Sequence, residues 1–339
     1  MTTKVPSAVE EAVGVPVDDL AALYLLDSIK QFGPQKFKLL YEAKLTPSDV
    51  IREPDLLPIT GKRGEKYRAE LRVKKADAYN TLLERAAKQI RRAHELQGAI
   101  ITYAHPFYPP IVYRSSYPVP LLYARGSLQV LKSQSTVACV GSRKIRLPYA
   151  TLHAAFVRHA CSHGFTIVSG FATGADTIGH EAAWRSAGQT TCVMPGGLDR
   201  PFPPENRELW ETFLHYSGAV LVSEFAFGTG ASALTLRKRN KLIVSCALGV
   251  LVSQSGMKGG ALNAYRFALE QSKPIATFVG DSSDDTAGNK MIASEPKAKA
   301  VALPLEEKAL SDSADQWLQQ LSSSISMERS GTAIPGMPK

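Results

Sequence analysis

Glycine and polar residues follow the apolar runs in the middle of the chain, and these residue types favour the binding of an anion. The first run, VACV, ends in Gly141-Ser142-Arg143, and a later one, ALGVLVSQS, leads to Lys258-Gly259-Gly260. The runs between them are followed by Ser169, Gly170, Gly174, Gly196 and Gly197. Glycine lets the main chain approach an anion closely, and the first turn of a helix offers unpaired N–H groups. A single glycine-rich turn is often needed only for the geometry of a tight turn. Several such turns after successive apolar runs predict a phosphate-binding edge.

A cluster of cations follows the fourth run and strengthens this interpretation. Its residues are Arg237, Lys238, Arg239, Asn240 and Lys241. We expect them to form a loop over the phosphate-binding edge. The cations would hold the backbone of a nucleic acid there, and the amide of Asn240 would supply hydrogen bonds.

Asp176 and His180 could form an acid–base pair, because they lie four positions apart where a helix should begin. A structural role is favoured, in which Asp176 caps the helix and His180 packs or forms a structural hydrogen bond. The sequence contains no P-loop, no GxGxxG fingerprint with a downstream acid and no GxSxG nucleophile elbow. We therefore expect a binding protein that catalyses no reaction and uses no cofactor.

The cysteines form neither a metal-binding nor a disulfide pattern. Cys139, Cys192 and Cys246 lie inside apolar runs, and no pair of cysteines has CxxC spacing. A free cysteine in such a run is usually a small buried hydrophobe. We expect no bound metal and a reducing compartment.

The elements that must position these residues form a predicted α/β domain over about residues 116–300. Apolar runs such as STVACV, FTIVSG and AVLVSE alternate there with helical segments. Runs that are apolar throughout belong to strands covered on both faces, and their alternation with helices predicts a mostly parallel, doubly wound sheet. Ligands bind beyond the carboxyl ends of the strands in such a sheet, which is where the glycine and polar residues fall.

The regions on either side of this domain have different patterns. We expect a flexible leader over residues 1–18 and a helical domain with a Pro- and Tyr-rich connector over residues 19–115. Within the helical domain, Thr46-Pro47-Ser48-Asp49 predicts a turn into a helix N-cap. Residues 301–339 form a polar tail with room for one short helix, SADQWLQQLSSS.

The net charge of +9 over 339 residues favours a polyanionic partner. Residues 61–100 alone hold eleven Lys and Arg against five acids. The interleaved acids leave two interpretations equally open, namely a nucleic-acid-binding patch and a solvated helix face with ion pairs. No apolar stretch is long enough to span a membrane, and the N-terminus lacks the apolar core of a signal peptide. We expect a cytoplasmic protein with no membrane partner.

A series of motifs over about residues 120–293 resembles the DNA-processing protein A (DprA/Smf) family. In order, the motifs are VGSR, SGFATGADTIGHEAAW, VMPGGLDRPFPPEN, VSEFAFGT, RKRNKLIVSCALGVLV, KGGALNAYRFAL and AGNKMI. The resemblance implies an extended Rossmann-like domain preceded by a small helical SAM-like domain. It also implies a homodimer that binds single-stranded DNA without catalysis and hands the strand to the recombinase RecA.

The resemblance also assigns residues to a DNA-binding pocket. Its DNA contacts would come from Gly141, Ser142, Arg143, Arg239, Asn240 and Lys241, with Arg237, Lys238 and Lys258 adding charge. The residues expected to shape the pocket are Ser169, Gly170, Gly174, Asp176, His180, Gly196, Gly197, Gly259 and Gly260.

Three departures from the family pattern indicate a specialised branch. Leu236 replaces the phenylalanine before the RN motif, which removes a base-stacking ring worth roughly 1–3 kcal/mol per base. Gln254 replaces a glutamate. The residues after 300 are too few and too polar for the winged helix often found at the C-terminus of the family.

Two further functions stay open. Related Rossmann-like domains bind small nucleotides, so the chain could be a nucleotide-sensing module. Proteins of this kind also serve as the antitoxin of a toxin protein in phage-defence systems. Single-stranded DNA binding ranks first, in recombination and transformation or in antiviral defence.

Overall fold

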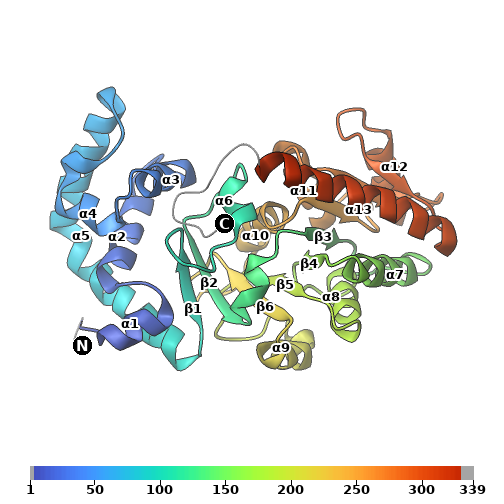
Figure 1. The fold of residues 1–339 in the computed structure, drawn as a ribbon, viewed down its shortest axis with the longest axis horizontal. Coiled ribbons are helices and arrows are strands. Elements are labelled where there is room, and N and C mark those ends of the chain that lie inside the picture. The colour runs from blue at the N-terminus through green and yellow to red at the C-terminus, as the bar shows by residue number, and fades with distance from the viewer. Residues whose placement is uncertain (1–3, 330–339) are drawn as a thin grey trace. The chain divides into compact units, whose positions relative to one another are not determined.

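The computed structural model describes residues 4–329, which divide into two units (Figure 1). The first unit contains residues 4–108 and Pro118–Ala124, and the second contains Pro109–Tyr117 and residues 125–329. The border predicted near residue 115 therefore separates the two units only approximately. Pro109–Tyr117 already belongs to the second unit, and Pro118–Ala124 belongs again to the first.

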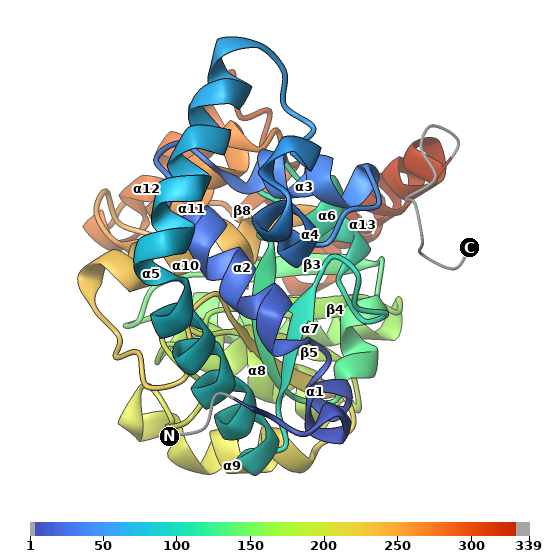
Figure 2. The same ribbon diagram turned by 90° about the vertical axis from the view of Figure 1, so that its left-hand side faces the viewer.

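The first unit consists of helices and one strand pair. Its elements are α1 (Ser7–Val13), α2 (Val17–Asp27), α3 (Pro34–Glu42), α4 (Pro47–Arg52), a 3₁₀ turn (Pro54–Leu56), α5 (Gly61–Glu95), β1 (Ala99–Thr102) and β2 (Leu121–Gly126). Figure 2 shows α2 lying along the long α5, and the buried Leu20 and Leu25 of α2 contribute to the core of this unit. β1 pairs antiparallel with β2, with Ile100 opposite Tyr123.

Two predictions for this region are wrong in part. Over residues 4–18, helix α1 and the start of α2 replace the flexible leader, because Val13, Val15 and Val17 are buried. The range expected to be helical also contains strand β1. The helix N-cap predicted at the turn Thr46-Pro47-Ser48-Asp49 is confirmed, and the structure assigns it to Thr46, whose side chain accepts a hydrogen bond from the N–H of Asp49.

The basic segment 61–100 lies mainly on α5, where four of its eleven cations form ion pairs with described residues. Arg72 lies 2.7 Å from Asp55, and Arg92 lies 3.0 Å from Glu95. Such exposed pairs contribute at most about 1 kcal/mol each. Their presence favours the solvated helix face over the nucleic-acid-binding patch.

The second unit alternates strands and helices, which confirms the predicted α/β class. Its elements are α6 (Pro110–Arg114), a 3₁₀ turn (Leu128–Lys132), β3 (Thr136–Val140), α7 (Tyr149–Ser162), β4 (Thr166–Ser169), α8 (Ala175–Arg185), β5 (Thr190–Val193), a 3₁₀ turn (Pro204–Asn206), α9 (Arg207–His215), β6 (Ala219–Ser223), α10 (Ala233–Ser245), β7 (Gly249–Val252), α11 (Gly260–Glu270), β8 (Ile275–Phe278), a 3₁₀ turn (Asp284–Thr286), α12 (Ala287–Ser294), β9 (Val301–Leu303) and α13 (Glu307–Arg329).

The strands of the second unit lie in the order β6-β5-β4-β3-β7-β8-β9, and neighbours run parallel. Parallel crossovers are right-handed, so α7, α8 and α9 cover one face of this sheet and α10, α11 and α12 cover the other. In agreement, α7 packs on α8 and α10 packs on α11 (Figure 1). Both faces of β3 to β8 are buried, which explains why these strands are predominantly apolar.

The C-terminal helix is longer than the short helix predicted from the sequence. Residues Glu307–Arg329 form α13, which packs on α7 and buries Leu310, Trp317 and Leu321. The apolar spacing begins before the predicted segment, at Leu310, so packing extends the helix at its N-terminal end. The part of the predicted tail after residue 329 lies outside the described residues.

Two expectations about composition can be compared directly with the structure. Cys139, Cys192 and Cys246 are buried free thiols, as their apolar surroundings indicated. Within residues 4–329, no helix combines the length and the hydropathy needed to span a membrane.

Candidate nucleic-acid interface

A cavity of about 690 Å³ lies at the carboxyl ends of β3 and β7. These two strands are neighbours, but the chain leaves β3 in one direction along the sheet and returns to β7 on its other side. Ligands bind at such a reversal of strand order because the flanking loops diverge there. Residues 140–143 and 255–260 line the cavity at the strand ends, and α10 and α11 complete it.

The structure brings together ten of the residues that the sequence assigned to this site. They are Gly141, Ser142, Arg143, Asp176, Arg237, Arg239, Asn240, Lys258, Gly259 and Gly260. The other assigned residues do not line the cavity, and several of them hold its walls in place.

The cation cluster lies on helix α10 rather than on the loop predicted for it. The hydroxyl of Ser232 accepts a hydrogen bond from the N–H of Thr235 at 3.2 Å, and the hydroxyl of Thr235 accepts one from the N–H of Ser232 at 2.8 Å. This capping box starts the helix at Ala233, before the first cation. Successive residues then point in directions about 100° apart, so consecutive cations cannot face one ligand together.

One stripe of α10 faces the cavity. Leu236, Arg237, Asn240 and Ile243 recur at helical spacing and line it. The side-chain amide of Asn240 donates to the carbonyl of Gly260 at 3.2 Å, which links α10 to the start of α11.

Lys238 and Lys241 lie outside the cavity lining, although the sequence placed them with Arg237 and Asn240. The Lys238 ammonium lies 3.4 Å from the Glu224 carboxylate. The Lys241 ammonium lies 4.7 Å from the centre of the Tyr117 ring. Their charges are therefore engaged next to α10 and not at the cavity.

Arg239 is buried and connects two strand ends. Its side chain is 5% exposed, and its Nη1 donates to the carbonyl oxygens of Gly170 and of Val193, the latter at 2.8 Å. Burial lowers the pKa of Arg239 to about 10, although the charge of Asp176 opposes this shift. Gly170 follows β4 and Val193 ends β5, so this guanidinium stabilises the carboxyl edge of the sheet.

Asp176 supplies the buried negative charge near Arg239. Its Oδ2 accepts a hydrogen bond from the N–H of Ala172 at 3.2 Å. Burial raises the pKa of the Asp176 carboxyl, while the charge of Arg239 and hydrogen bonds from the main chain act in the opposite direction. The predicted role as a helix cap is not what the structure shows, because the N-cap of α8 is Gly174 and no side chain caps it.

His180 is enclosed in the core, away from the cavity lining. Its Nδ1 lies 2.7 Å from the hydroxyl of Thr190, and its ring packs against Phe171 and Phe213. Burial, followed by the positive charge of Arg239, lowers the pKa of His180 to about 3. A neutral, enclosed imidazole has no route for proton transfer to a ligand in the cavity.

Gly174 holds the loop that presents Arg143. Its φ is +80°, and a Cβ at this position would lie 2.5 Å from the carbonyl oxygens of both Ser142 and Arg143. The N–H of Ala175 donates to the Ser142 carbonyl at 3.1 Å, which fixes the same loop to the start of α8.

The remaining predicted residues support the strand ends from outside the cavity. The Ser169 hydroxyl donates to the Cys139 carbonyl at 2.6 Å and joins β4 to β3. Gly196 and Gly197 lie against the loop that precedes α10, where the N–H of Gly197 donates to the Thr229 carbonyl at 2.9 Å.

Four cations around the cavity are exposed and form no ion pair with any described residue. They are Arg143, Arg237, Lys258 and Arg266. Sequence reasoning missed Arg266, because it lies on α11 beyond the strand end. The signal that could have found it is its helical spacing of seven residues from Gly259.

The first turn of α11 adds unpaired main-chain donors. Its N-cap, Gly259, provides no side-chain cap, and Gly260, Ala261 and Leu262 line the cavity. The first N–H groups of a helix lack intrahelical partners and carry partial positive charge. Together with the exposed cations, they give the cavity a positively charged lining of the kind that suits an anion.

Comparisons with known proteins agree with this geometry. The sequence model of the family described as DNA recombination-mediator protein A matches residues 99–310, which is more than half of the chain. The protein Smf of Synechocystis sp. is 33% identical over 175 residues. That match covers 50% of this chain and 43% of the relative, so the chain spans less than half the length of this relative.

Two solved structures show the same fold. DNA processing protein A from Streptococcus pneumoniae superposes with a TM-score of 0.62 at 19% identity, covering 91% of this chain and 97% of that one. DNA processing protein A from Helicobacter pylori, whose structure concerns its single-stranded DNA binding mode, gives a TM-score of 0.55 at 20% identity. That similarity covers 68% of this chain and 97% of the other. From the match over residues 99–310, the chain belongs to the DNA recombination-mediator protein A family.

Proposed function

We propose that this protein binds single-stranded DNA in the cavity at the carboxyl ends of β3 and β7 and catalyses no reaction on it. The observation that carries the proposal is the set of four exposed cations around this cavity, none of which forms an ion pair with a described residue. The described lining contains one acid, Asp176, and that acid is buried. Phosphates bound here would release condensed counterions, which drives association at low salt.

Family membership supports DNA as the polyanion. Members of this family are recombination mediators, and the related protein from Helicobacter pylori binds single-stranded DNA. Transfer of that property to this chain is part of the proposal, because fold similarity at 20% identity does not by itself identify a ligand.

The cavity favours contacts to phosphates over contacts to bases. No aromatic side chain is among its described lining residues. Leu236, which directly precedes Arg237 in the sequence, lines the cavity with an aliphatic side chain. Contacts to phosphates carry no sequence information, whereas hydrogen bonds to base edges do. The protein should therefore bind strands of different sequence with similar affinity.

A recombination mediator must pass its strand to another protein. We extend the proposal to such a hand-over, with a recombinase as the recipient. Homodimer formation, antiviral defence and the antitoxin role remain predictions from the sequence.

A nucleotide is the alternative occupant of the cavity. Its volume of about 690 Å³ falls within the range of small-molecule sites. The same cations would hold the phosphates of a nucleotide, so the experiment must separate a strand from a mononucleotide.

The test is fluorescence anisotropy of a labelled oligo-dT strand with the full chain. We compare wild type with Arg143→Ala and Arg266→Ala, and use Arg207→Ala, an exposed arginine on α9, as the matched control. Binding that weakens in the first two variants and persists in the control supports the proposal. Absence of strand binding by folded wild type, with binding of a labelled nucleotide instead, would identify a nucleotide sensor.

A further inference from the structure

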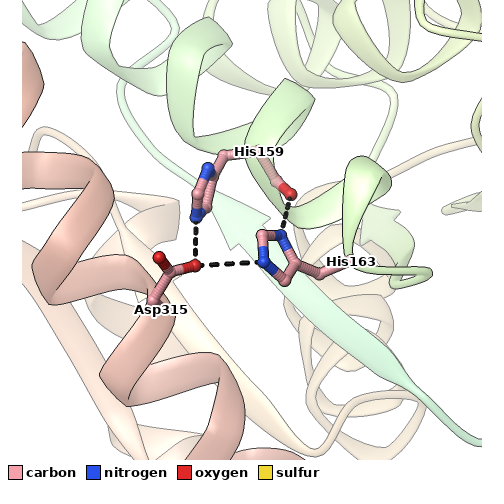
Figure 3. A group of neighbouring side chains, drawn as sticks. All are labelled: His159, His163 and Asp315. Atoms are coloured by element: carbon pink, nitrogen blue, oxygen red, sulfur yellow. Dashed lines mark hydrogen bonds and ion pairs between the residues drawn. The ribbon is translucent and has the colours of Figure 1, made fainter.

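Two histidines and one aspartate meet where α13 packs on α7, away from the DNA cavity (Figure 3). His159 and His163 lie four residues apart on α7 and therefore on the same face of that helix. Asp315 comes from α13 and points between their rings. Metal-binding histidines on one helix commonly have this spacing.

The donor atoms converge on one point. The Nε2 of His159 lies 2.6 Å from Oδ1 of Asp315, and the Nε2 of His163 lies 3.1 Å from the same oxygen. All three atoms lie within 4.8 Å of one another. Two ligands of a tetrahedral Zn²⁺ ion lie about 3.3 Å apart. The two distances to Asp315 differ from this value by less than about 1 Å, and the remaining separation, within 4.8 Å, would have to shorten by at most about 1.5 Å.

The hydrogen bonds of His163 determine which of its nitrogens can face Asp315 as a lone pair. The Ser162 hydroxyl donates its only hydrogen to the carbonyl oxygen of His159 at 2.8 Å. The Nδ1 of His163 lies 2.9 Å from that carbonyl and 3.3 Å from the Ser162 hydroxyl oxygen, so Nδ1 must carry a hydrogen to satisfy either contact. In the neutral ring, Nε2 then presents a lone pair.

This arrangement places a lone pair of His163 against a carboxylate oxygen of Asp315, which is repulsive unless a cation lies between them. A proton on Nε2 is one solution, and a metal ion is the other. A metal-binding histidine usually donates its second ring nitrogen to a carbonyl or carboxylate, which is the bond that Nδ1 of His163 makes with the main chain of His159.

We propose that His159, His163 and Asp315 form a binding site for a divalent transition-metal ion of the Zn²⁺ class. Two imidazole nitrogens and one carboxylate oxygen suit this class, whereas Mg²⁺ and Ca²⁺ prefer oxygen ligands alone. The three side chains are partly exposed, at 22%, 45% and 37%, so water can fill the remaining coordination position.

A metal at this point would connect α13 to α7. Beside the cluster, Trp317 of α13 packs on Phe156 of α7 with ring centres 5.9 Å apart. Because binding to the folded state alone stabilises it by mass action, Zn²⁺ should raise the unfolding temperature of the protein.

The experiment titrates the full chain with Zn²⁺ alone in competition with a chromophoric chelator. We compare wild type with His159→Ala, His163→Ala and Asp315→Asn. His215→Ala removes an exposed histidine of α9, and Cys161→Ser removes a partly exposed thiol of α7, so these two are the matched controls. Circular dichroism establishes that each variant is folded.

We expect one Zn²⁺ per chain, and affinity on the order of 10-fold or more weaker after loss of any one of the three ligands. Both controls should bind as wild type does, and the Zn²⁺-induced rise in unfolding temperature should disappear with the site. Binding that survives in Asp315→Asn and in both histidine variants overturns the proposal. So does loss of binding in Cys161→Ser, or no specific binding by wild type.

Discussion

The Nη1 of Arg239 lies inside the α/β unit, 2.8 Å from the carbonyl oxygen of Val193. The same nitrogen also donates to the carbonyl of Gly170, so one guanidinium joins the carboxyl ends of β4 and β5. Arg239 lies in the sequence motif RKRN, and the sequence analysis predicted that it contacts DNA. Its burial assigns it to the support of the cavity, while the exposed Arg237 remains available to a phosphate.

Substitution of Arg239 should therefore reduce stability. Arg239→Ala removes two hydrogen bonds and leaves the carboxyl of Asp176 buried without its nearest positive charge. Loss of one partner of a buried charge pair costs about 3–5 kcal/mol. Urea unfolding followed by circular dichroism measures the change, with Arg237→Ala as the exposed control on the same helix. Equal stability of Arg239→Ala and wild type would contradict this assignment.

Gly174→Ala should impair both folding and DNA binding. The backbone of Gly174 has φ +80° and ψ −125°, and a Cβ would collide with the carbonyls of Ser142 and Arg143. Such strain costs on the order of 1–3 kcal/mol and displaces the loop that carries Arg143.

Gly164→Ala is the matched control for this prediction. Gly164 also has a positive φ, +76°, but a Cβ there meets nothing within 4 Å. We expect Gly164→Ala to be destabilised yet to bind oligo-dT as wild type does, whereas Gly174→Ala binds more weakly in anisotropy measurements. Similar DNA affinity of the two variants would show that the Ser142–Arg143 loop is not part of the interface.

Leu236→Phe should strengthen binding. Leu236 lines the cavity, and an aromatic ring there could stack on a base, which contributes about 1–3 kcal/mol. The corresponding gain in oligo-dT affinity is roughly 5- to 150-fold. Leu234→Phe, on the same helix but outside the cavity lining, should leave the affinity unchanged. A gain of equal size in both variants would point to non-specific hydrophobic contact.

The stability of the fold should fall in mild acid because His180 is buried as a neutral ring. Its pKa is lowered from 6.5 to about 3, first by burial and then by the charge of Arg239. The unfolded chain therefore takes up a proton below about pH 6.5 that the folded chain excludes down to about pH 3. Above about pH 6.5, His180 makes its full contribution to the free energy of unfolding. Between about pH 6.5 and about pH 3, that contribution decreases by about 1.4 kcal/mol for each unit by which the pH falls.

His180→Phe isolates this contribution, because Phe171 and Phe213 already surround the ring with aromatic groups. His153, whose pKa burial lowers to about 4, remains in both proteins and cancels in the comparison. Urea unfolding between about pH 6 and about pH 4.5 should show a shallower pH dependence for the variant. Identical slopes would mean that His180 is protonated in the folded protein.

The sequence was sufficient to predict the α/β domain and the strand ends that meet at the cavity. Uniformly apolar strands followed by Gly141 or Gly259 carry a strong local signal, because burial on both faces and close approach of the main chain restrict the residue types. The orientation of side chains along α10 was not predicted. The capping box at Ser232 starts a helix where a loop was expected. Because successive residues of a helix point in directions about 100° apart, Lys238 and Arg237 then face different sides of α10.

Residues that meet only through tertiary packing were the ones that sequence reasoning missed. Arg266 reaches the cavity from the second turn of α11. Asp315 meets His159 only because α13 packs on α7. Arg266 lies in the motif KGGALNAYRFAL, but only its helical spacing from Gly259 indicates that it reaches the cavity. Asp315 lies in none of the family motifs, so spacing along the chain gives no indication of its partners.

The salt dependence of oligo-dT binding tests the central claim most directly. We compare wild type with the combined variant Arg143→Ala, Arg237→Ala, Lys258→Ala and Arg266→Ala, and with Arg207→Ala. Each phosphate contact on a single strand contributes about 0.7 to the slope of log affinity against log salt. The account predicts a slope smaller by roughly 3 in the combined variant and unchanged in the control. An unchanged slope in the combined variant, with the fold intact, would contradict the assignment of this cavity to DNA.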